Sequence, residues 1–188
     1  VTGVQTCALP ISSIQTNDIK DENYAEMWQA YENVTHAGSC VRTYQQCCFT
    51  EIDTFRAFLA DGFKTGYGDD LNRVGPLKLF VDGSLGARTA KLNAPYADDA
   101  STTGITVMDQ NYLDEICAIA AENGMSVATH AIGDKAIEMI LEAYEKSLPD
   151  SSNPLRNGVI HCQITTPATL EQFRKNNILA QVQPIFID

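Results

Sequence analysis

The sequence predicts an α/β fold built on a parallel sheet. Short apolar runs rich in small and β-branched residues alternate with segments of helical periodicity, at a spacing of about 30 residues that suits a strand–helix–strand unit. Two of the runs end on a histidine, at His130 and His161, as expected where an α/β barrel places side chains at the rim of its sheet. Since repeated strand–helix–strand units favour parallel strands and right-handed crossovers, we predict a parallel sheet, and 188 residues are too few for a complete (β/α)₈ barrel of about 250 residues.

Six strands and five helices are expected between them. The predicted strands are residues 13–16, 40–44, 76–81, 126–129, 158–161 and 178–182. The predicted helices begin at residue types that cap helix N-termini, namely Asp21, Thr50, Asp109, Asp134 and Thr166. The residues at helical spacing that should face the core are Tyr24, Met27, Tyr31 and Val34; Ile52, Phe55 and Leu59; Leu113, Ile116, Cys117 and Ala120; and Ile137, Ile140, Leu141 and Tyr144. Residues 84–108 show no periodicity, which in a compact domain indicates a functional or disordered connection.

The first eleven residues are predicted to be foreign to the fold. The segment VTGVQTCALPI carries no charge and resembles the in-frame translation of a common sequencing adapter. An ordinary N-terminal strand is the alternative. We therefore assign residues 1–11 to a library scar and residues 12–188 to the fold.

Composition excludes several classes of function. The net charge of −11 argues against a nucleic-acid partner, which requires a basic surface. No run of about 18 apolar residues is present, so no membrane-spanning helix is expected. The six cysteines form no Cys-x-x-Cys pair, and several occupy apolar positions, which favours a reduced, cytoplasmic chain over a disulfide framework.

His130 and His161 are the strongest candidates for chemistry. Both lie at the ends of successive predicted parallel strands, so their side chains should point into the same space. Neutral imidazole is a common ligand of zinc and similar ions, although a catalytic zinc normally has three protein ligands. Hydrogen-bonded structural histidines are the alternative. The third histidine, His36, lies at a helix end and is interpreted as structural.

Lys78 is the candidate third member of this site. It lies inside the apolar run Leu77–Val81, where burying its charge would be costly. Three interpretations remain open: a surface lysine that extends its ammonium to water, a lysine carboxylated by carbon dioxide that becomes an anionic metal ligand, or a desolvated lysine that forms a Schiff base.

The segment that follows this strand, Asp82–Thr89, could contact a ligand. Gly83 permits close approach of the backbone, and Arg88 offers a guanidinium fork to a carboxylate or carbonyl group. A solvated loop is the alternative. Asp134 is primarily expected to be a helix N-cap, with a hydrogen bond to a ligand histidine as a secondary possibility.

These residues occur within an ordered set of motifs: LKLFVDGSLGARTA, NAPYADD, VATHAIGDKAI, IHCQ and VQPIF. Over about residues 13–188 the set resembles the amidohydrolase superfamily, in particular the YtcJ-like branch, or amidohydrolase family 3, which includes N-substituted formamide deformylases. The resemblance implies a metal-dependent hydrolase on a distorted barrel, with a divalent metal, foremost zinc, as one or two ions. The metal would lower the pKa of a bound water and polarise the scissile carbonyl of a small-molecule amide or formamide.

The resemblance also implies roles for individual residues. Lys78 matches a strand-4 lysine that is carboxylated in many relatives, while His130 and His161 match the metal ligands of strands 5 and 6. The residues matching the loop that borders the substrate pocket are Asp82, Gly83, Ser84 and Arg88.

Some parts of the family pattern are missing. The His-x-His pair of strand 1 is absent, Ile160 replaces a glutamate found in many relatives, and the general-base aspartate of strand 8 is expected beyond residue 188. We therefore expect about strands 2–7 of a longer enzyme, inactive alone. The competing hypotheses are a metal-free lyase or aldolase that uses Lys78 as a Schiff base, and a non-catalytic binding fragment with open strand edges. No oligomeric state is predicted.

Overall fold

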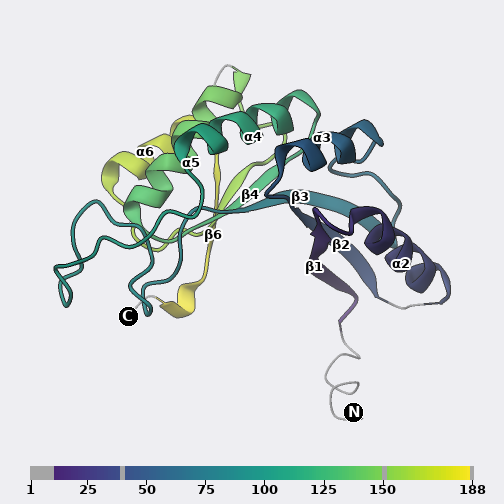
Figure 1. Cartoon of the computed structure of the whole chain (residues 1–188), viewed down its shortest axis with the longest axis horizontal. Coiled ribbons are helices and arrows are strands. Elements are labelled where there is room, and N and C mark those ends of the chain that lie inside the picture. Colours follow the sequence, from purple (N-terminus) through teal and green to yellow (C-terminus); the bar gives the residue numbers. More distant parts are fainter. Residues whose placement is uncertain (1–10, 39–40, 150–151, 187–188) are drawn as a thin grey trace, which may run out of the picture. The chain divides into compact units, whose positions relative to one another are not determined.

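The computed structural model describes residues 11–38, 41–149 and 152–186, and it divides into two compact units. Unit 1 is Val1–Pro76 and unit 2 is Leu77–Asp188. The described strands are β1 (Ser13–Lys20), β2 (Arg42–Cys48), β3 (Asn72–Phe80), β4 (Val127–Ala131), β5 (Gly158–His161) and β6 (Leu179–Val182). The described helices are α2 (Tyr24–His36), α3 (Ile52–Ala60), α4 (Gln110–Glu122), α5 (Asp134–Ser147) and α6 (Pro167–Lys175), followed by the short 3₁₀ helix η2 (Pro184–Phe186). The predicted alternation of strand and helix is confirmed (Figure 1).

Two predictions fall on residues outside this description. The proposed adapter segment occupies residues 1–11, of which residues 1–10 are not described. Cys40, the first residue of the second predicted strand, is also not described. The division of the chain at residue 12 therefore stays a prediction.

Unit 1 contains β1, β2 and the first half of β3, around an aromatic core. β1 pairs in parallel with β2, and the register shifts between Thr16 and Ile19. This irregularity explains why the predicted strand was too short: the polar residues Asn17 and Asp18 interrupt the apolar pattern, although the strand continues to Lys20. A cluster of aromatic rings in mutual contact extends from the fully buried Phe49, Phe55 and Phe58 to the exposed Tyr67, and consists of Tyr24, Trp28, Phe49, Phe55, Phe58, Phe63 and Tyr67. Two predicted core positions are wrong, since Val34 is 62% exposed and Phe58, not Leu59, is the buried residue near the end of α3.

Two of the five predicted helix starts are confirmed. The Asp109 side chain accepts a hydrogen bond from the backbone N–H of Tyr112, and Thr166 forms a capping box before Pro167. Asp21 and Thr50 do not cap their helices, because α2 follows Asn23 and α3 follows Glu51. The Asp21 carboxylate instead accepts hydrogen bonds from Thr50 and from the Glu51 N–H, so Asp21 acts at the start of the next helix.

In unit 2, α4, α5 and α6 cover one face of a parallel sheet (Figure 1). The end of β3 pairs with β4, β4 with β5, and β5 with β6, all in parallel. The predicted inward residues of α4 and α5 are all buried, as are Leu77, Leu79 and Val81 on β3 and in the residue that follows it. The helices therefore anchor one face of the strands, and every second residue faces the other side.

An exposed histidine contact in unit 1 should make stability depend on pH. His36 Nε2 lies 2.8 Å from Asp69 Oδ2, and its Nδ1 lies 2.9 Å from the Glu32 carbonyl oxygen and 3.7 Å from the Glu32 carboxylate. The hydrogen bond to Asp69, followed by that to the Glu32 carbonyl, raises the pKa of His36. Backbone N–H groups of Leu71 and Asn72, followed by His36, lower the pKa of Asp69 to about 2.

The sign of the pH effect follows from these two shifts. A raised histidine pKa stabilises the fold below the unfolded value of about 6.5, and this stabilisation is lost as pH rises through the folded pKa. A lowered aspartate pKa stabilises the fold above about pH 4, and this stabilisation is lost as pH falls toward 2. In urea unfolding, His36→Gln should therefore lower stability more at pH 5.5 than at pH 8.5. An equal or larger loss at pH 8.5 would contradict this assignment. So would an Asp69→Asn variant whose stability changes between pH 5.5 and 8.5 as it does in the unmodified chain, because Asp69 is the partner of His36.

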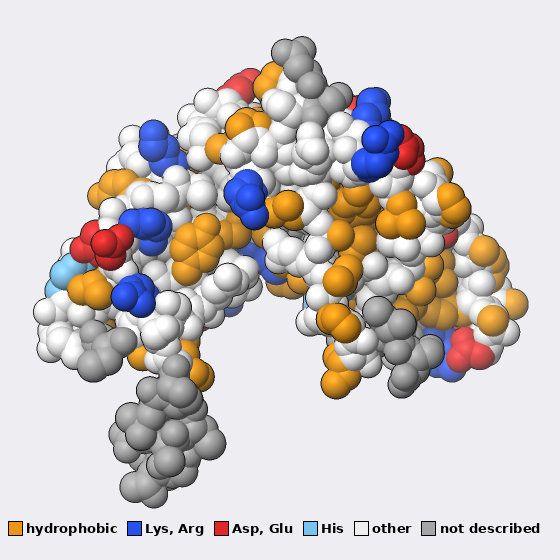
Figure 2. All heavy atoms as spheres, turned by 180° about the vertical axis from the view of Figure 1, so that it is seen from behind, with side chains coloured by type: hydrophobic (Ala, Val, Ile, Leu, Met, Phe, Trp, Pro, Cys, Tyr) orange, Lys and Arg blue, Asp and Glu red, His pale blue; other side chains and the backbone are white. Residues whose placement is uncertain are grey.

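No helix in the described part of the chain is long and apolar enough to cross a membrane. Lysine and arginine side chains stand beside acidic ones on the face shown in Figure 2, although the whole chain carries a net charge of −11. The acidic excess is therefore not gathered on that face.

Candidate metal site

The structure brings His130 and His161 together. His130 is the second-last residue of β4, and His161 is the last residue of β5. Their ring centroids lie 4.7 Å apart in an edge-to-face arrangement. His130 is in register with Ile160, while His161 is in register with Ala131. The two histidines are therefore one residue out of step, not at equivalent points of their strands.

An unusual backbone conformation is present at His161. Simple alternation would turn its side chain toward the helices, on the same face as the buried Val159. Instead φ is +75° at His161 and +49° at Cys162. Both residues are therefore in the left-handed region, which residues other than glycine rarely adopt. This turn re-aims the His161 ring toward His130. Strained backbone of this kind clusters at functional sites.

The hydrogen bonds of the two rings determine which nitrogen atoms are free to bind a ligand. His130 Nε2 lies 2.8 Å from the Gly83 carbonyl oxygen, which can only accept, so the neutral ring carries its proton on Nε2 and leaves Nδ1 bare. The same Nε2 lies 3.3 Å from Asp82 Oδ1. His161 has the opposite arrangement, because its Nδ1 lies 2.7 Å from Gln183 Oε1. The neutral ring therefore carries its proton on Nδ1, and Nε2 has a free lone pair.

Lys78 shares the sheet face of His130 and is linked to it through Phe80. Lys78 is in register with Ala128, which is in register with Gly158, and these small neighbours leave room for the long side chain. Its Nζ donates a hydrogen bond to the Leu79 carbonyl oxygen at 3.1 Å and lies 3.6 Å from the centroid of the Phe80 ring. The Phe80 ring in turn contacts His130, with centroids 5.6 Å apart. Lys78 is only 7% exposed, so it is not a surface lysine that reaches into water.

Asp82 anchors the loop that follows β3 and contacts His130. Its buried carboxylate accepts hydrogen bonds from the backbone N–H groups of Lys91 at 2.8 Å, Ile132 at 3.1 Å and Gly133 at 2.8 Å. These contacts join the end of β3 to the β4–α5 turn and to the irregular segment 84–108. The close approach requires glycine at Gly133, where an added Cβ would lie 2.0 Å from the Lys91 carbonyl oxygen.

The other predicted substrate contacts lie in a tight turn after Asp82. Gly83 has no room for a side chain, since an added Cβ would lie 2.1 Å from Thr89 Oγ1. The Ser84 N–H donates to Thr89 Oγ1, and the Ser84 residue is exposed. The Arg88 guanidinium forms a two-pronged contact with Asp98, at 3.2 Å through Nε and 2.7 Å through Nη2. Their contact with a substrate stays a prediction.

The predicted N-cap role of Asp134 is wrong. The N-cap of α5 is Gly133, and Asp134 is the first residue of the helix. The Asp134 carboxylate accepts hydrogen bonds from the backbone N–H of Asn93 at 2.9 Å and from its side-chain amide at 3.2 Å. Asp134 therefore holds segment 84–108 against α5, a pairing across 41 residues that no local sequence pattern reveals.

Cys162 follows His161 directly and is buried. Burial raises the pKa of its thiol to about 11, so it remains protonated near neutral pH. In the described ranges, Cys47, Cys117 and Cys162 are free thiols.

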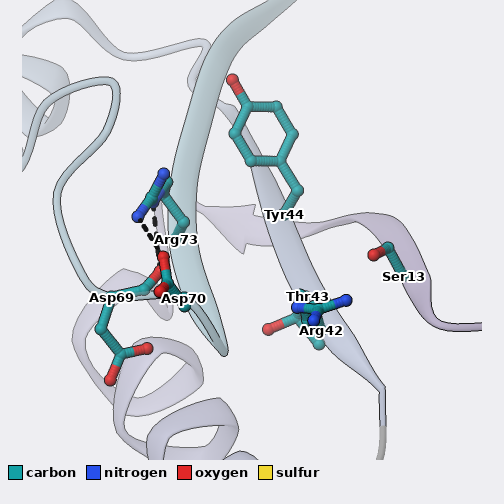
Figure 3. Close-up of a pocket in the computed structure, with 7 residues that line it drawn as sticks. All are labelled: Ser13, Arg42, Thr43, Tyr44, Asp69, Asp70 and Arg73. Carbon is teal, nitrogen blue, oxygen red and sulfur yellow. Dashed lines mark hydrogen bonds and ion pairs between the residues drawn. The ribbon is translucent and has the colours of Figure 1, made fainter.

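A separate pocket in unit 1 contains none of the predicted site residues. It lies at the amino ends of the strands and is lined by Ser13, Arg42, Thr43, Tyr44, Asp69, Asp70 and Arg73 (Figure 3). Arg73 pairs there with Asp70 at 3.1 Å, so its charge is already partly compensated. Ligand sites of α/β barrels lie at the carboxyl ends of the strands, where His130 and His161 are found.

The side chains at this site supply some, but not all, of the ligands that a metal ion requires. Among residues 11–38, 41–149 and 152–186, no three histidine, cysteine or acidic side chains converge on one point. The two bare imidazole nitrogens can act as ligands, whereas Lys78 could join them only after carboxylation, because an ammonium has no lone pair. Gln183 contacts His161 but was not predicted as a site residue. Its position directly after β6 is the feature of the sequence that could have identified it.

The sequence pattern of the amidohydrolase family matches residues 3–188. The chain belongs to the amidohydrolase family. This amidohydrolase chain is 42% identical over 113 residues to YtcJ of Bacillus subtilis (strain 168), covering 60% of the chain and 21% of YtcJ. It is 33% identical over 163 residues to the protein LONG AFTER FAR-RED 3 of Arabidopsis thaliana, covering 84% of the chain and 28% of that protein. The chain thus spans between a fifth and a third of the length of these relatives.

Solved structures confirm the predicted fold class. A metal-dependent hydrolase of uncharacterised function from Pyrococcus furiosus superposes with a TM-score of 0.79 at 27% identity, over 98% of this amidohydrolase chain and 36% of the hydrolase. A second one, from Pyrococcus horikoshii OT3, has the same TM-score at 28% identity, over 97% of the chain and 36% of its partner in the comparison. The α/β alternation is accordingly that of a partial barrel of the metal-dependent hydrolase type.

Proposed function

We propose that His130 and His161 bind a divalent metal ion, zinc foremost, in an enzyme that hydrolyses a non-peptide carbon–nitrogen bond of a small amide or formamide. The observation that carries this proposal is the approach of the two rings to 4.7 Å at the carboxyl ends of β4 and β5, each with one bare nitrogen. Membership of the amidohydrolase family and the likeness to two metal-dependent hydrolases support it. A bound metal would supply an acidified water and polarisation of the scissile carbonyl.

The chain's own residues orient the ligands. The Gly83 carbonyl oxygen accepts a hydrogen bond from His130 Nε2–H, and the Asp82 carboxylate lies close to the same nitrogen. This leaves the lone pair of Nδ1 to bind the metal. Polar partners on the second ring nitrogen fix the orientation and raise the basicity of metal-bound histidines. The loop that begins at the buried Asp82 carboxylate is the part of the chain where we propose that the substrate is held.

Lys78 is proposed to become a third ligand after carboxylation. In that step the neutral amine attacks carbon dioxide, a C–N bond forms, and one proton is released to give the carbamate. The contact between Nζ and the Phe80 ring stabilises the ammonium, which is unreactive toward both carbon dioxide and carbonyl substrates. Carboxylation and Schiff-base formation both require loss of this proton from Nζ, so the contact does not decide between them.

We also propose that the protein works in a reducing, cytoplasmic setting. The support is that Cys47, Cys117 and Cys162 are free thiols buried in the fold.

Metal analysis of the 188-residue chain tests the proposed function. After loading with Zn²⁺ and removal of excess by gel filtration, bound zinc per chain should fall at least tenfold in the double variant His130→Ala/His161→Ala. The matched control is His36→Ala, which removes the remaining histidine and should leave bound zinc unchanged. Zinc retained by the double variant at the level of the unmodified chain would refute the proposal, as would an equal loss in His36→Ala.

A further inference from the structure

Gln183 lies directly after β6 and holds the ring of His161. Its side-chain Oε1 accepts the hydrogen bond from His161 Nδ1 at 2.7 Å. β5 and β6 are parallel, and His161 is in register with Val182, so the residue after Val182 comes beside the ring. We propose that Gln183 is a positioning residue that selects the Nδ1–H tautomer of His161 and thereby presents Nε2 to the metal. This inference rests on the proposed function.

His161 depends on such a partner more than His130 does. The His130 side chain is only 13% exposed, and its Nε2 faces a main-chain carbonyl oxygen, which no substitution at position 83 removes. His161 is half-buried, as His130 is, but its ring is held by a side chain that can be substituted, and its backbone has the strained φ of +75°. The hydrogen bond to the Gln183 amide distinguishes the two nitrogens of the His161 ring. Losing it should let the neutral ring populate both tautomers.

A matched control lies two residues earlier, on β6. Gln181 has the same side chain, but its amide nitrogen lies over Gly158, 3.1 Å from where a Cβ would be at that glycine. Gln181 is in register with Ile160, not with His161. Gln181→Leu therefore removes an amide from β6 without removing the partner of His161.

The test measures the tautomer without metal and then the affinity for zinc. Long-range ¹H–¹⁵N correlation spectra of the ¹⁵N-labelled chain are recorded at about pH 8.5, well above the usual histidine pKa near 6.5. His161 should be the Nδ1–H tautomer in the unmodified chain, in Gln183→Glu and in Gln181→Leu, and a mixture in Gln183→Leu. Zinc titration against a competing indicator should show Kd raised about 10- to 100-fold in Gln183→Leu and within about threefold of the unmodified chain in the other two variants.

The outcomes separate this inference from the proposed function. Unchanged tautomer and Kd in Gln183→Leu, together with weakened zinc binding in His161→Ala, would overturn the role of Gln183 and leave the metal site intact. Unchanged zinc binding in His161→Ala would overturn the proposed function itself. An equal effect of Gln181→Leu would also overturn the inference, because the cause would then be the strand and not the hydrogen bond.

Discussion

Replacing Asp82 with alanine should cost about 3–5 kcal/mol of unfolding free energy, a large share of the roughly 5–15 kcal/mol typical of a domain. The carboxylate is buried and accepts hydrogen bonds from three backbone N–H groups, those of Lys91, Ile132 and Gly133. An alanine would leave these donors without their partner in the interior, and each unsatisfied buried donor costs about 1–3 kcal/mol before water enters. Urea unfolding followed by circular dichroism measures the loss.

Asp134→Ala is the matched control for this prediction. Asp134 also accepts hydrogen bonds from segment 84–108, but its carboxylate is in contact with water and faces the N–H groups of Asn93. Its loss should cost about 1 kcal/mol or less, because water can replace the missing acceptor. A cost for Asp82→Ala no greater than that for Asp134→Ala would show that the buried acceptor does not hold the loop.

The fold was predictable wherever burial and periodicity agree. α4 and α5 each carry an unbroken apolar stripe, and β4 is a run of small and β-branched residues between clear turn signals, so all three were placed within a residue or two. β1 was predicted too short because a shift in register breaks its alternation. The cap assignments of Asp21 and Asp134 failed for a different reason: both carboxylates have partners distant in sequence, at Thr50 and Asn93.

The candidate site was predictable in its residue types but not in its geometry. Strand ends located His130 and His161, and the apolar run located Lys78. The left-handed backbone at His161, which turns its ring toward His130, leaves no trace in composition or spacing. Gln183 was missed because its contact depends on the register of β5 and β6, and that register is determined by packing of the whole sheet.

Tyr144→Phe should destabilise unit 2 by about 1–3 kcal/mol, because it removes one oxygen from a buried network. The Tyr144 hydroxyl lies 2.9 Å from Thr129 Oγ1 and donates to the Gly158 carbonyl oxygen at 2.9 Å. Complete burial raises the pKa of the phenol well above its usual value, so the hydroxyl remains a neutral donor. The network links α5 to β4 and β5, the two strands that deliver the candidate ligands.

A double-mutant cycle with Thr129→Val tests whether the network acts as a unit. In the unmodified chain, Thr129→Val leaves the Tyr144 hydroxyl with one partner fewer, whereas in Tyr144→Phe that partner is already gone. The second substitution should therefore cost less in the Tyr144→Phe background, with a coupling of about 1 kcal/mol by urea unfolding. Strictly additive costs would mean that the 2.9 Å contact contributes nothing to stability. A measured coupling would show that α5 stabilises β4 and β5 through a polar contact, and not through apolar packing alone, directly beneath the strand ends where His130 and His161 meet.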